Sequence, residues 1–348
     1  MRTPGFFPVG TFGAVRGLST SDLREANVEG ILSNTYHLFL RPGPEVIANA
    51  GGLHGFMSWE GPILTDSGGF QLHSLDHLAS TSEDGVTFKS PIDGSSHFLS
   101  PEVCIEVQEQ LGADLIVVLD HFEPVREGAV EDPSRTRALM ERTLRWAARC
   151  KRQHRRTDQM LFGIVQGGGL PALRRESAER TVELGFRGHA IGGLGLGESR
   201  ERRSELLEAC LEPLPSETPR YMMGIGNPED IVDAVLRGVD VFDCVVPTRN
   251  GRHGSVFTPE GRVNLRNARF KTAREPIDPA CACPTCAHYS AGYLHHLLKV
   301  GEALGARLCS LHNVAFYMHL MADLRDAISQ GRIAAFATAW RARYLALG

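Results

Sequence analysis

Short apolar segments alternate with longer amphipathic segments about eight times before residue 250 of this 348-residue chain. This alternation restricts the fold more than any other feature, because a helix between two strands returns the chain to build a parallel sheet. Eight repeats favour an α/β chain closed into a (β/α)8 TIM barrel, although an open doubly wound sheet has the same periodicity. The expected strands are residues 6–9, 30–32, 63–64, 115–119, 162–165, 190–191, 221–223 and 241–242.

Amphipathic helices are expected between these strands. Residues 101–111 carry Val103, Val107 and Leu111 at the i, i+4, i+8 spacing of one helix face. Similar patterns cover residues 133–154, 171–184, 201–210 and 228–236, and several of these segments open with proline at a first-turn position.

Polar residues or glycine follow nearly every expected strand. A single Gly or Asp at such a point also marks an ordinary turn. Seven together favour the carboxyl-terminal face of a barrel, where active sites lie. These strand ends are residues 34–37, 66–69, 120–121, 166–168, 192–193, 224–226 and 243–244.

Composition excludes several classes of protein. A hydrophobic content of 42% and a charged content of 22% are typical of a globular chain, not of a disordered one. No apolar run is long enough to cross a membrane, and the N-terminus lacks the pattern of a secretory signal. The net charge of −4 predicts no globally basic surface, and eight dispersed cysteines favour the reducing cytoplasm.

The chain changes in character after Pro247, where a basic, glycine-containing segment is followed by a cysteine cluster and further apolar helical stretches. We expect residues 1–255 to form the main part of the barrel and residues 256–325 a small zinc-binding insertion. Residues 326–348 are expected to return to the barrel as a C-terminal helix.

The cluster Cys281-Ala-Cys283-Pro-Thr-Cys286 is typical of a metal site. Three thiolates within six residues can hold one tetrahedral ion, and a fourth N or S ligand would close the shell. Zinc is the expected ion, because thiolate-rich tetrahedral sites favour it. Spacing alone leaves the fourth ligand open among His288, His295, His296, His312 and Cys309.

Two strand-end carboxylates, Asp66 and Asp243, are candidates for catalysis. A pair of carboxylates suits chemistry at an anomeric carbon, where one attacks the carbon and the other moves protons. Each could instead cap a helix. Arg249 and Arg252 follow Asp243 closely and could anchor an anionic polymer, or simply belong to a solvated loop. The glycine-rich segments 192–197 and 224–230 do not match the dinucleotide fingerprint.

Five segments, in order, resemble the tRNA-guanine transglycosylases, or queuine tRNA-ribosyltransferases, of the bacterial type. They are Leu64-Thr-Asp-Ser-Gly-Gly-Phe-Gln71, Phe162-Gly-Ile-Val-Gln-Gly167, Ile191-Gly-Gly-Leu194, Met223-Gly-Ile-Gly-Asn-Pro-Glu-Asp230 and Phe242-Asp-Cys-Val-Val-Pro-Thr-Arg-Asn-Gly-Arg252. The cysteine cluster and His312-Asn-Val-Ala-Phe-Tyr317 also fit, so the resemblance covers about residues 4–345.

The resemblance implies a zinc-containing TIM-barrel pentosyltransferase of queuosine biosynthesis. Such an enzyme exchanges guanine at the wobble position of tRNAs with GUN anticodons for a 7-deazaguanine, through a covalent enzyme–RNA intermediate. It also implies a homodimer. By position, Asp243 would be the nucleophile and Asp66 the general acid/base.

The resemblance assigns further residues to three groups. The base pocket would comprise Asp66, Ser67, Gly68, Gly69, Phe70, Asp120, Gln166, Gly193, Leu194 and Met223, with Phe70 and Met223 stacking on the two faces of the base. RNA would be contacted by Gly224, Ile225, Gly226, Asn227, Pro228, Glu229, Asp230, Thr248, Arg249, Asn250, Gly251 and Arg252. One structural zinc ion would be held by Cys281, Cys283, Cys286 and His312.

Three departures from the family pattern stand out. The chain begins almost directly at Pro8-Val-Gly10, without the leading segment usual in the family. His121-Phe122 stands where bacterial relatives commonly have Glu-Cys, and Leu196 where they usually have Val. Both side-chain changes narrow the pocket if they point inward, which favours preQ1, with its small aminomethyl group, over queuine.

Three other functions are compatible with parts of the pattern. A queuine-using salvage enzyme of the same family differs only in the incoming base. A barrel glycoside hydrolase could use Asp66 and Asp243, but it leaves the arginine-bearing loop and the cysteine cluster unexplained. A non-catalytic RNA-binding homologue would have lost one or both carboxylates, whereas this chain keeps both.

Overall fold

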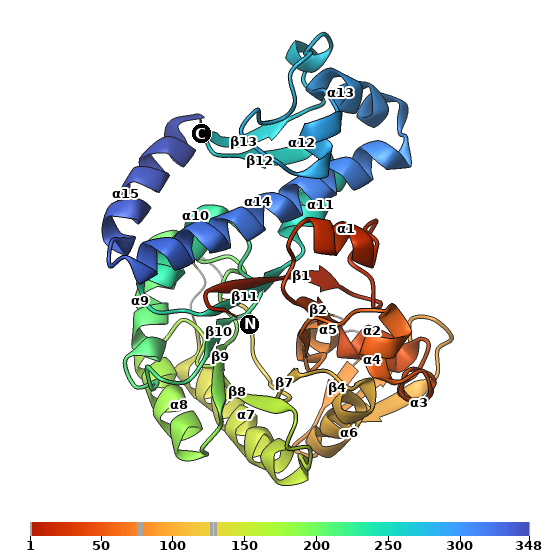
Figure 1. The fold of residues 1–348 in the computed structure, drawn as a ribbon. Coiled ribbons are helices and arrows are strands. Elements are labelled where there is room, and N and C mark those ends of the chain that lie inside the picture. Colours follow the sequence, from red (N-terminus) through yellow and green to blue (C-terminus); the bar gives the residue numbers. More distant parts are fainter. Residues whose placement is uncertain (1, 75–78, 126–127, 129–130, 348) are drawn as a thin grey trace.

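In a computed structural model, eight parallel strands close into a barrel (Figure 1). The structure describes residues 2–74, 79–125, 128 and 131–347. Neighbouring strands are in parallel register around the ring, with Phe6 opposite Phe242 and Leu32 opposite Leu64. The barrel, predicted from the strand–helix alternation, is therefore confirmed. Its strands are β1 (Gly5–Gly10), β2 (Ile31–Ser33), β3 (Ile63–Thr65), β7 (Leu115–Val117), β8 (Met160–Val165), β9 (Gly188–Ile191), β10 (Arg220–Met222) and β11 (Val241–Cys244).

The predicted helices form the outer layer between the strands. Their bounds are α6 (Pro101–Leu111), α7 (Pro133–Gln153), α8 (Pro171–Glu183), α9 (Arg200–Leu211) and α10 (Pro228–Leu236). Ser100 and Ser199 cap α6 and α9 by accepting a backbone N–H of the first turn, which supplies one of the partners that a helix start lacks. A short helix, α1 (Thr20–Glu25), lies between β1 and β2.

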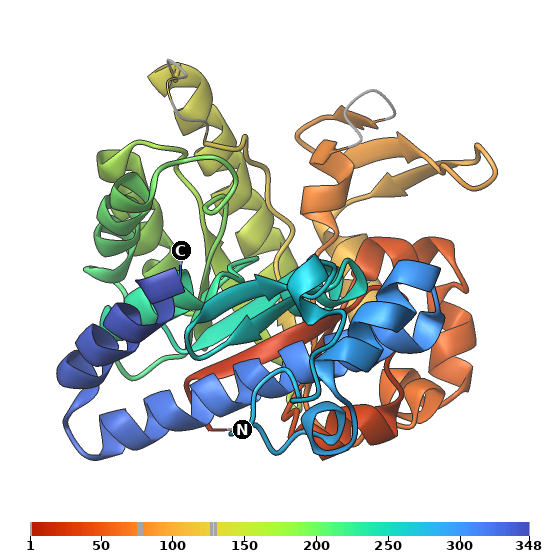
Figure 2. The same cartoon turned by 90° about the horizontal axis from the view of Figure 1, so that it is seen from above.

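Two excursions from the alternating pattern were not expected from the sequence. After β2 the chain forms three short helices, α2 (Thr35–Leu40), α3 (Pro44–Asn49) and α4 (Gly52–Met57). After β3 and α5 (Gly69–Ser74), an antiparallel sheet of β4 (Ala79–Thr81), β5 (Val86–Lys89) and β6 (Ser96–Leu99) precedes α6. Figure 2 shows this sheet and the start of α7 standing out from the same side of the barrel.

The segment after β11 leaves the barrel and returns to it. It contains α11 (Val246–Arg252), the hairpin of β12 (Ser255–Thr258) and β13 (Gly261–Asn264), η2 (Ala268–Phe270), α12 (Pro284–His288), α13 (Ala291–Val300), α14 (Ala303–Ser329), α15 (Ile333–Tyr344) and η3 (Leu345–Leu347). In Figure 1, α14 runs from this region along the barrel to α15. The boundary expected at residue 325 falls inside α14, and the division into three domains stays a prediction.

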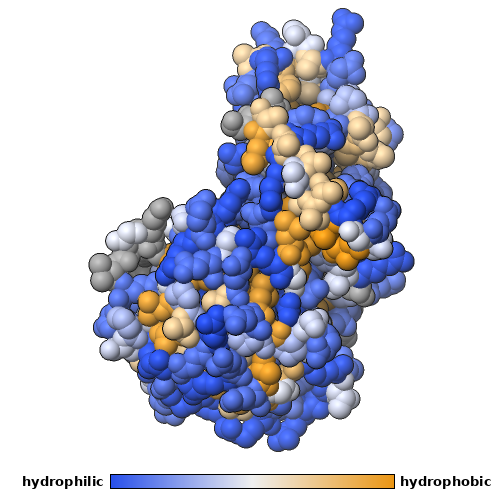
Figure 3. Space-filling view, turned by 90° about the vertical axis from the view of Figure 1, so that its left-hand side faces the viewer, coloured by the Kyte–Doolittle hydropathy of each residue, from blue (hydrophilic) through white to orange (hydrophobic). Residues whose placement is uncertain are grey.

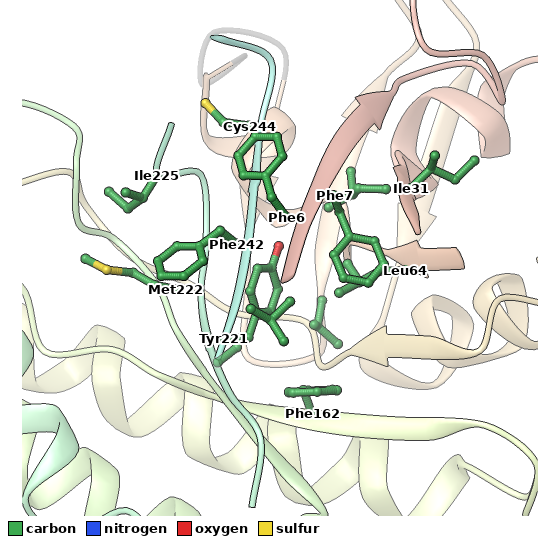
Figure 4. Close-up of a cluster of buried hydrophobic side chains, with 14 of the residues drawn as sticks. Phe6, Phe7, Ile31, Leu64, Phe162, Tyr221, Met222, Ile225, Phe242 and Cys244 are labelled. Atoms are coloured by element: carbon green, nitrogen blue, oxygen red, sulfur yellow. The ribbon is translucent and has the colours of Figure 1, made fainter. Parts of the chain in front are cut away.

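The barrel interior is filled by large apolar side chains rather than left as a channel. Phe7 and Phe162 are almost fully buried, and Figure 4 shows them among side chains that converge from neighbouring strands. Burying each of these rings contributes about 1.5–3 kcal/mol. Tyr221 lies in the same cluster, with its ring 6.2 Å from that of Phe162. It brings a hydroxyl into this otherwise apolar layer, beneath the cavity described below.

The outer surface is mostly polar. Figure 3 shows one face, on which hydrophilic residues predominate and apolar residues gather in smaller separate groups. Within the described part of the chain, no helix combines the length and apolar character needed to cross a membrane.

Candidate active site and metal centre

A cavity of about 380 Å³ opens where the carboxyl ends of the barrel strands meet. Most residues of the predicted base pocket line it, and they come from strand ends far apart in the sequence. The predicted pocket residues that line the cavity are Asp66, Ser67, Gly68, Gly69, Phe70, Asp120, Gly193, Leu194 and Met223. Asp243, the predicted nucleophile, also lines it. The active-site face predicted from the polar strand ends therefore contains a cavity.

Asp243 is held rigidly at the end of β11. Its Oδ1 accepts a hydrogen bond of 2.6 Å from the Tyr221 hydroxyl and one of 2.8 Å from the backbone N–H of Gly224. Burial raises the pKa of the Asp243 carboxyl, while these two donors lower it by stabilising the ionised form. Both bonds end on Oδ1, and Oδ2 makes no hydrogen bond to any residue that the structure describes.

Asp66 lies in a different electrostatic environment, directly after β3. Its Oδ1 accepts the N–H of Thr35 at 2.8 Å, and its Oδ2 accepts the side-chain amide of Asn34, the N-cap of α2. Burial raises the pKa of Asp66 to about 7, and the charges of Asp243 and Asp120 also raise it. The hydrogen bond from the Thr35 N–H acts in the opposite direction and lowers the pKa. A carboxyl with a pKa near 7 can both give and take a proton at neutral pH.

Asp120 lines the cavity, and Gln166 is hydrogen-bonded to it. Gln166 donates from Nε2 to Oδ2 of Asp120 over 2.7 Å, and both side chains are buried. The Gln166 side chain does not itself reach the cavity lining, but its unpartnered, buried Oε1 lies beside Gly193. A Cβ at Gly193 would lie 2.7 Å from this oxygen, and its φ of +71° also requires glycine.

The two predicted RNA-contacting segments divide between the cavity and the interior. From residues 224–230, Gly224, Ile225, Gly226, Asn227 and Asp230 line the cavity, whereas Pro228 is buried and Glu229 pairs with Arg200. Segment 248–252 lies within α11, of which Arg249 is exposed and lines the cavity.

The rest of α11 packs against α14. Thr248 and Gly251 are buried there, and a Cβ at Gly251 would lie 2.6 Å from backbone atoms of Ser310. Asn250 is half-buried on the same helix. The α11–α14 contact therefore sets the orientation from which Arg249 reaches the cavity.

Arg249 and Arg252, both predicted from the sequence, have a third cation nearby, Arg16, which the sequence did not indicate. Arg252 is half-buried, its Nη1 has no partner, and burial together with the charges of Arg16 and Arg249 lowers the pKa of its guanidinium group. Among the described residues, Arg16, Arg249 and Arg252 form no ion pair. These three guanidinium groups form a local basic patch on a chain of net charge −4, and Arg249 joins the patch to the cavity.

The cysteine cluster converges with one histidine. The ligand atoms of Cys281, Cys283, Cys286 and His312 lie within 4.8 Å of one another, which makes this group suitable for a metal ion such as zinc. The three Sγ atoms lie 3.9, 3.6 and 3.3 Å from His312 Nδ1. Tetrahedral zinc with ordinary Zn–S and Zn–N bonds requires about 3.6 Å between such atoms.

The surroundings of His312 also fit a metal ligand. Its Nε2 lies 2.8 Å from the carbonyl of Phe257, an arrangement that leaves Nδ1 with a lone pair toward the thiolates. Of the other candidates, His295 is turned away and bonds the carbonyl of Leu265, and Cys309 is buried in a separate apolar cluster. The tertiary structure thus selects one histidine among those that spacing left open.

Sequence reasoning missed several residues of the site besides Arg16. Tyr221 was only part of an expected strand, although its spacing of two from Met223 places both on one strand face. Glu198 and Arg203 were also missed, and Arg203 lines the cavity. No local signal marks Arg203, because its partners lie on other elements.

Comparisons with known proteins agree along the whole chain. The family model described as queuine tRNA-ribosyltransferase matches residues 1–346. The queuine tRNA-ribosyltransferase of Zymomonas mobilis is 49% identical over 351 residues, covering 99% of this chain and 90% of the relative. That of Thioalkalivibrio sulfidiphilus is 52% identical over 336 residues, covering 97% and 90%. That of Symbiobacterium thermophilum is 50% identical over 345 residues, covering 99% and 85%.

Proposed function

Because this chain belongs to the queuine tRNA-ribosyltransferase family, and so is a pentosyltransferase of a family that acts on tRNA, we propose the following reaction for it. The enzyme exchanges guanine at the wobble position of tRNAs with GUN anticodons for preQ1, a 7-deazaguanine, through a covalent enzyme–RNA intermediate. The observation that carries this proposal is the pair of carboxylates in one cavity, Asp243 and Asp66, whose different surroundings suit different roles.

Asp243 supplies the nucleophile in this mechanism. With Oδ1 held by Tyr221 and Gly224, Oδ2 attacks C1′ of the wobble ribose, and the bond from C1′ to N9 of guanine breaks. The departing N9 takes the proton of Asp66, whose pKa of about 7 keeps a protonated fraction available. The ribose is then bound to Asp243 as an ester.

The incoming base completes the exchange. Asp66, now ionised, removes the N9 proton of the 7-deazaguanine, and N9 attacks C1′ as the ester bond to Asp243 breaks. Two displacements at one carbon retain the β configuration. Asp120 and Gln166 suit the hydrogen-bonding edge of the pyrimidine ring, and Phe70 and Met223 would stack on the two faces of the base.

The metal centre would hold zinc as a structural ion. Cys281, Cys283, Cys286 and His312 would fill a tetrahedral shell, which leaves no position for a reacting water molecule. The ion when bound cross-links α12 to α14, and no step of the base exchange involves it. Two further expectations stay predictions: a cytoplasmic enzyme, and a homodimer that light scattering would detect at twice 38.1 kDa.

Base preference is a prediction that rests on two side chains in the cavity wall. Leu196 and Phe122 both line the cavity, and Cδ2 of the Phe122 ring lies 3.4 Å from the position of a Cβ on Gly193. We expect kcat/KM for preQ1 to exceed that for queuine by about tenfold or more on one tRNA, because the cyclopentenediol of queuine would collide with these side chains. Equal or better use of queuine would contradict this preference.

Leu196→Ala provides the companion measurement. It should raise kcat/KM for queuine more than for preQ1, because it removes bulk only where the substituent at C7 differs. Leu345→Ala, at an exposed residue on η3, is the matched control and should alter neither value.

RNA binding is predicted to depend on the arginine group of α11. Arg249→Ala and Arg252→Ala should each raise KM for tRNA and reduce the salt dependence of binding by about one charge, because each removes one phosphate contact. Zinc content should not change. Arg175→Ala is the matched control, because Arg175 is an exposed arginine on α8 that pairs with Glu212, the residue after α9. Unaltered tRNA kinetics in both α11 variants would place the RNA elsewhere.

A further inference from the structure

The loop between β9 and α9 has little rigidity of its own. Gly193, Gly195 and Gly197 have φ values of +71°, +77° and +149°, conformations that a chain of other residues would not adopt. A backbone so rich in glycine is free to take many arrangements unless other groups hold it. Leu196, in the middle of the loop, lines the cavity and is 37% exposed. Its position therefore depends on whatever fixes the loop.

Glu198 is the residue that holds the loop. Its carboxylate accepts the backbone N–H of Gly195 at 2.5 Å, that of Leu196 at 3.2 Å and that of Gly197 at 3.3 Å. Three consecutive N–H groups directed at one side chain restrict the loop to a single arrangement. The Glu198 side chain is only 1% exposed, so its charge needs a cation nearby.

Arg203 is that cation, and it also forms an ion pair with a second carboxylate, that of Asp230. Its Nη1 lies 3.7 Å from Oε1 of Glu198, and its Nη2 lies 2.6 Å from Oδ1 of Asp230 on α10. The Arg203 side chain is 14% exposed and lines the cavity together with Asp230. Asp230 in turn accepts the side-chain amide of Asn227 at 3.1 Å. One guanidinium group thus joins the α9 wall of the cavity to the α10 wall.

We propose that Arg203 is a positioning residue that determines which incoming base the enzyme accepts. By holding Glu198, it keeps the loop in one arrangement and Leu196 across the part of the cavity that the substituent at C7 would occupy. This inference rests on the proposed function, in which Leu196 excludes a bulky base.

The consequence of losing Arg203 follows from the charges that it separates. Without it, Glu198 would have no cationic partner among the described residues, whereas Asp230 would keep Arg200 at 3.2 Å. The Glu198 carboxylate would then turn toward water and release the three N–H groups. The loop would become mobile, and Leu196 could move aside for a larger substituent.

The test compares Arg203→Met with Arg200→Met. Both variants remove one cation from Asp230, but only the first removes the cation that faces Glu198. Steady-state kcat/KM is measured for queuine and for preQ1 on the same tRNA. The ratio of queuine to preQ1 should rise about tenfold in Arg203→Met and stay within about twofold of the wild-type ratio in Arg200→Met.

A change in this ratio distinguishes positioning from a general loss of stability, which would lower both values together. An unchanged ratio in Arg203→Met, or an equal rise in Arg200→Met, would overturn the role of Arg203. If Arg203→Met does not fold, Arg203→Lys decides the question. Its compact ammonium group cannot span both carboxylates, so the ratio should still rise by threefold or more, and no rise would overturn the proposal.

The wild-type measurement separates this inference from the proposal on which it rests. A wild-type ratio near one contradicts the proposed exclusion of queuine, and with it the premise of the inference. A wild-type ratio far below one that Arg203→Met leaves in place contradicts the role of Arg203 alone.

Discussion

Asp243→Ala should abolish the covalent enzyme–RNA adduct and reduce base exchange on the order of 10⁴-fold or more, as the loss of a catalytic nucleophile does in other enzymes. Asp243→Asn should fail in the same way, because an amide of the same shape can keep a bond from Gly224 but cannot attack C1′. Denaturing electrophoresis after incubation with tRNA should show a shifted protein–RNA band with the wild type and none with either variant.

Two controls make this test decisive. Zinc content of the variants should match the wild type, because Asp243 lies in the barrel and not in the metal centre. Asp66→Ala is tested in parallel. An adduct that persists in Asp243→Ala and disappears in Asp66→Ala would exchange the two roles, and an adduct of equal yield in all variants would exclude both carboxylates as nucleophile.

Removal of the metal ion should unfold the region around α12 before it affects the barrel. Structural zinc binds with about 10–16 kcal/mol in small zinc domains, which is comparable to the whole stability of about 5–15 kcal/mol of a typical protein. Without the ion, the Thr285 hydroxyl still donates to the Leu308 carbonyl of α14 over 2.8 Å, but the loop that carries Cys281 and Cys283 loses its link to His312. Hydrogen exchange after chelation should increase first in residues 274–288 and later in the barrel strands.

The chemistry should be lost only indirectly in the chelated protein. Asn313 on α14 donates to the carbonyls of Pro247 and Ser255 at 2.9 and 3.0 Å, so disorder in α14 would displace α11 and its Arg249. We therefore expect KM for tRNA to rise before kcat falls.

Two cysteine variants test the same assignment. Cys286→Ser should lose the metal, whereas Cys309→Ala, at a buried cysteine outside the cluster, should keep one zinc ion per chain. Elemental analysis that finds no zinc in freshly prepared, active wild type would contradict the structural role.

The sequence by itself determined those features that depend on neighbours along the chain. Short apolar runs predicted the eight barrel strands, because strands covered on both faces are apolar throughout. The 3.6-residue period of one buried face predicted helices α6 to α10. The cysteine cluster is likewise local, since its three thiols span six residues. Asp66 and Asp243 were recognisable as strand-end carboxylates. The antiparallel sheet β4–β6 was not, because its strands are short and only β5 alternates clearly between buried and exposed residues.

Only the tertiary structure decided how residues far apart in the chain act on one another. The Tyr221 hydroxyl meets Asp243 because β10 and β11 pair in parallel, and the pKa of Asp66 rises because closure of the barrel buries it near Asp243 and Asp120. His312 meets the three thiols, and His295 does not, through the packing of α14 against the cysteine loop. Arg203 joins Glu198 to Asp230 across two helices. Each of these effects depends on distance and burial, which a linear order of residues encodes only through the complete fold.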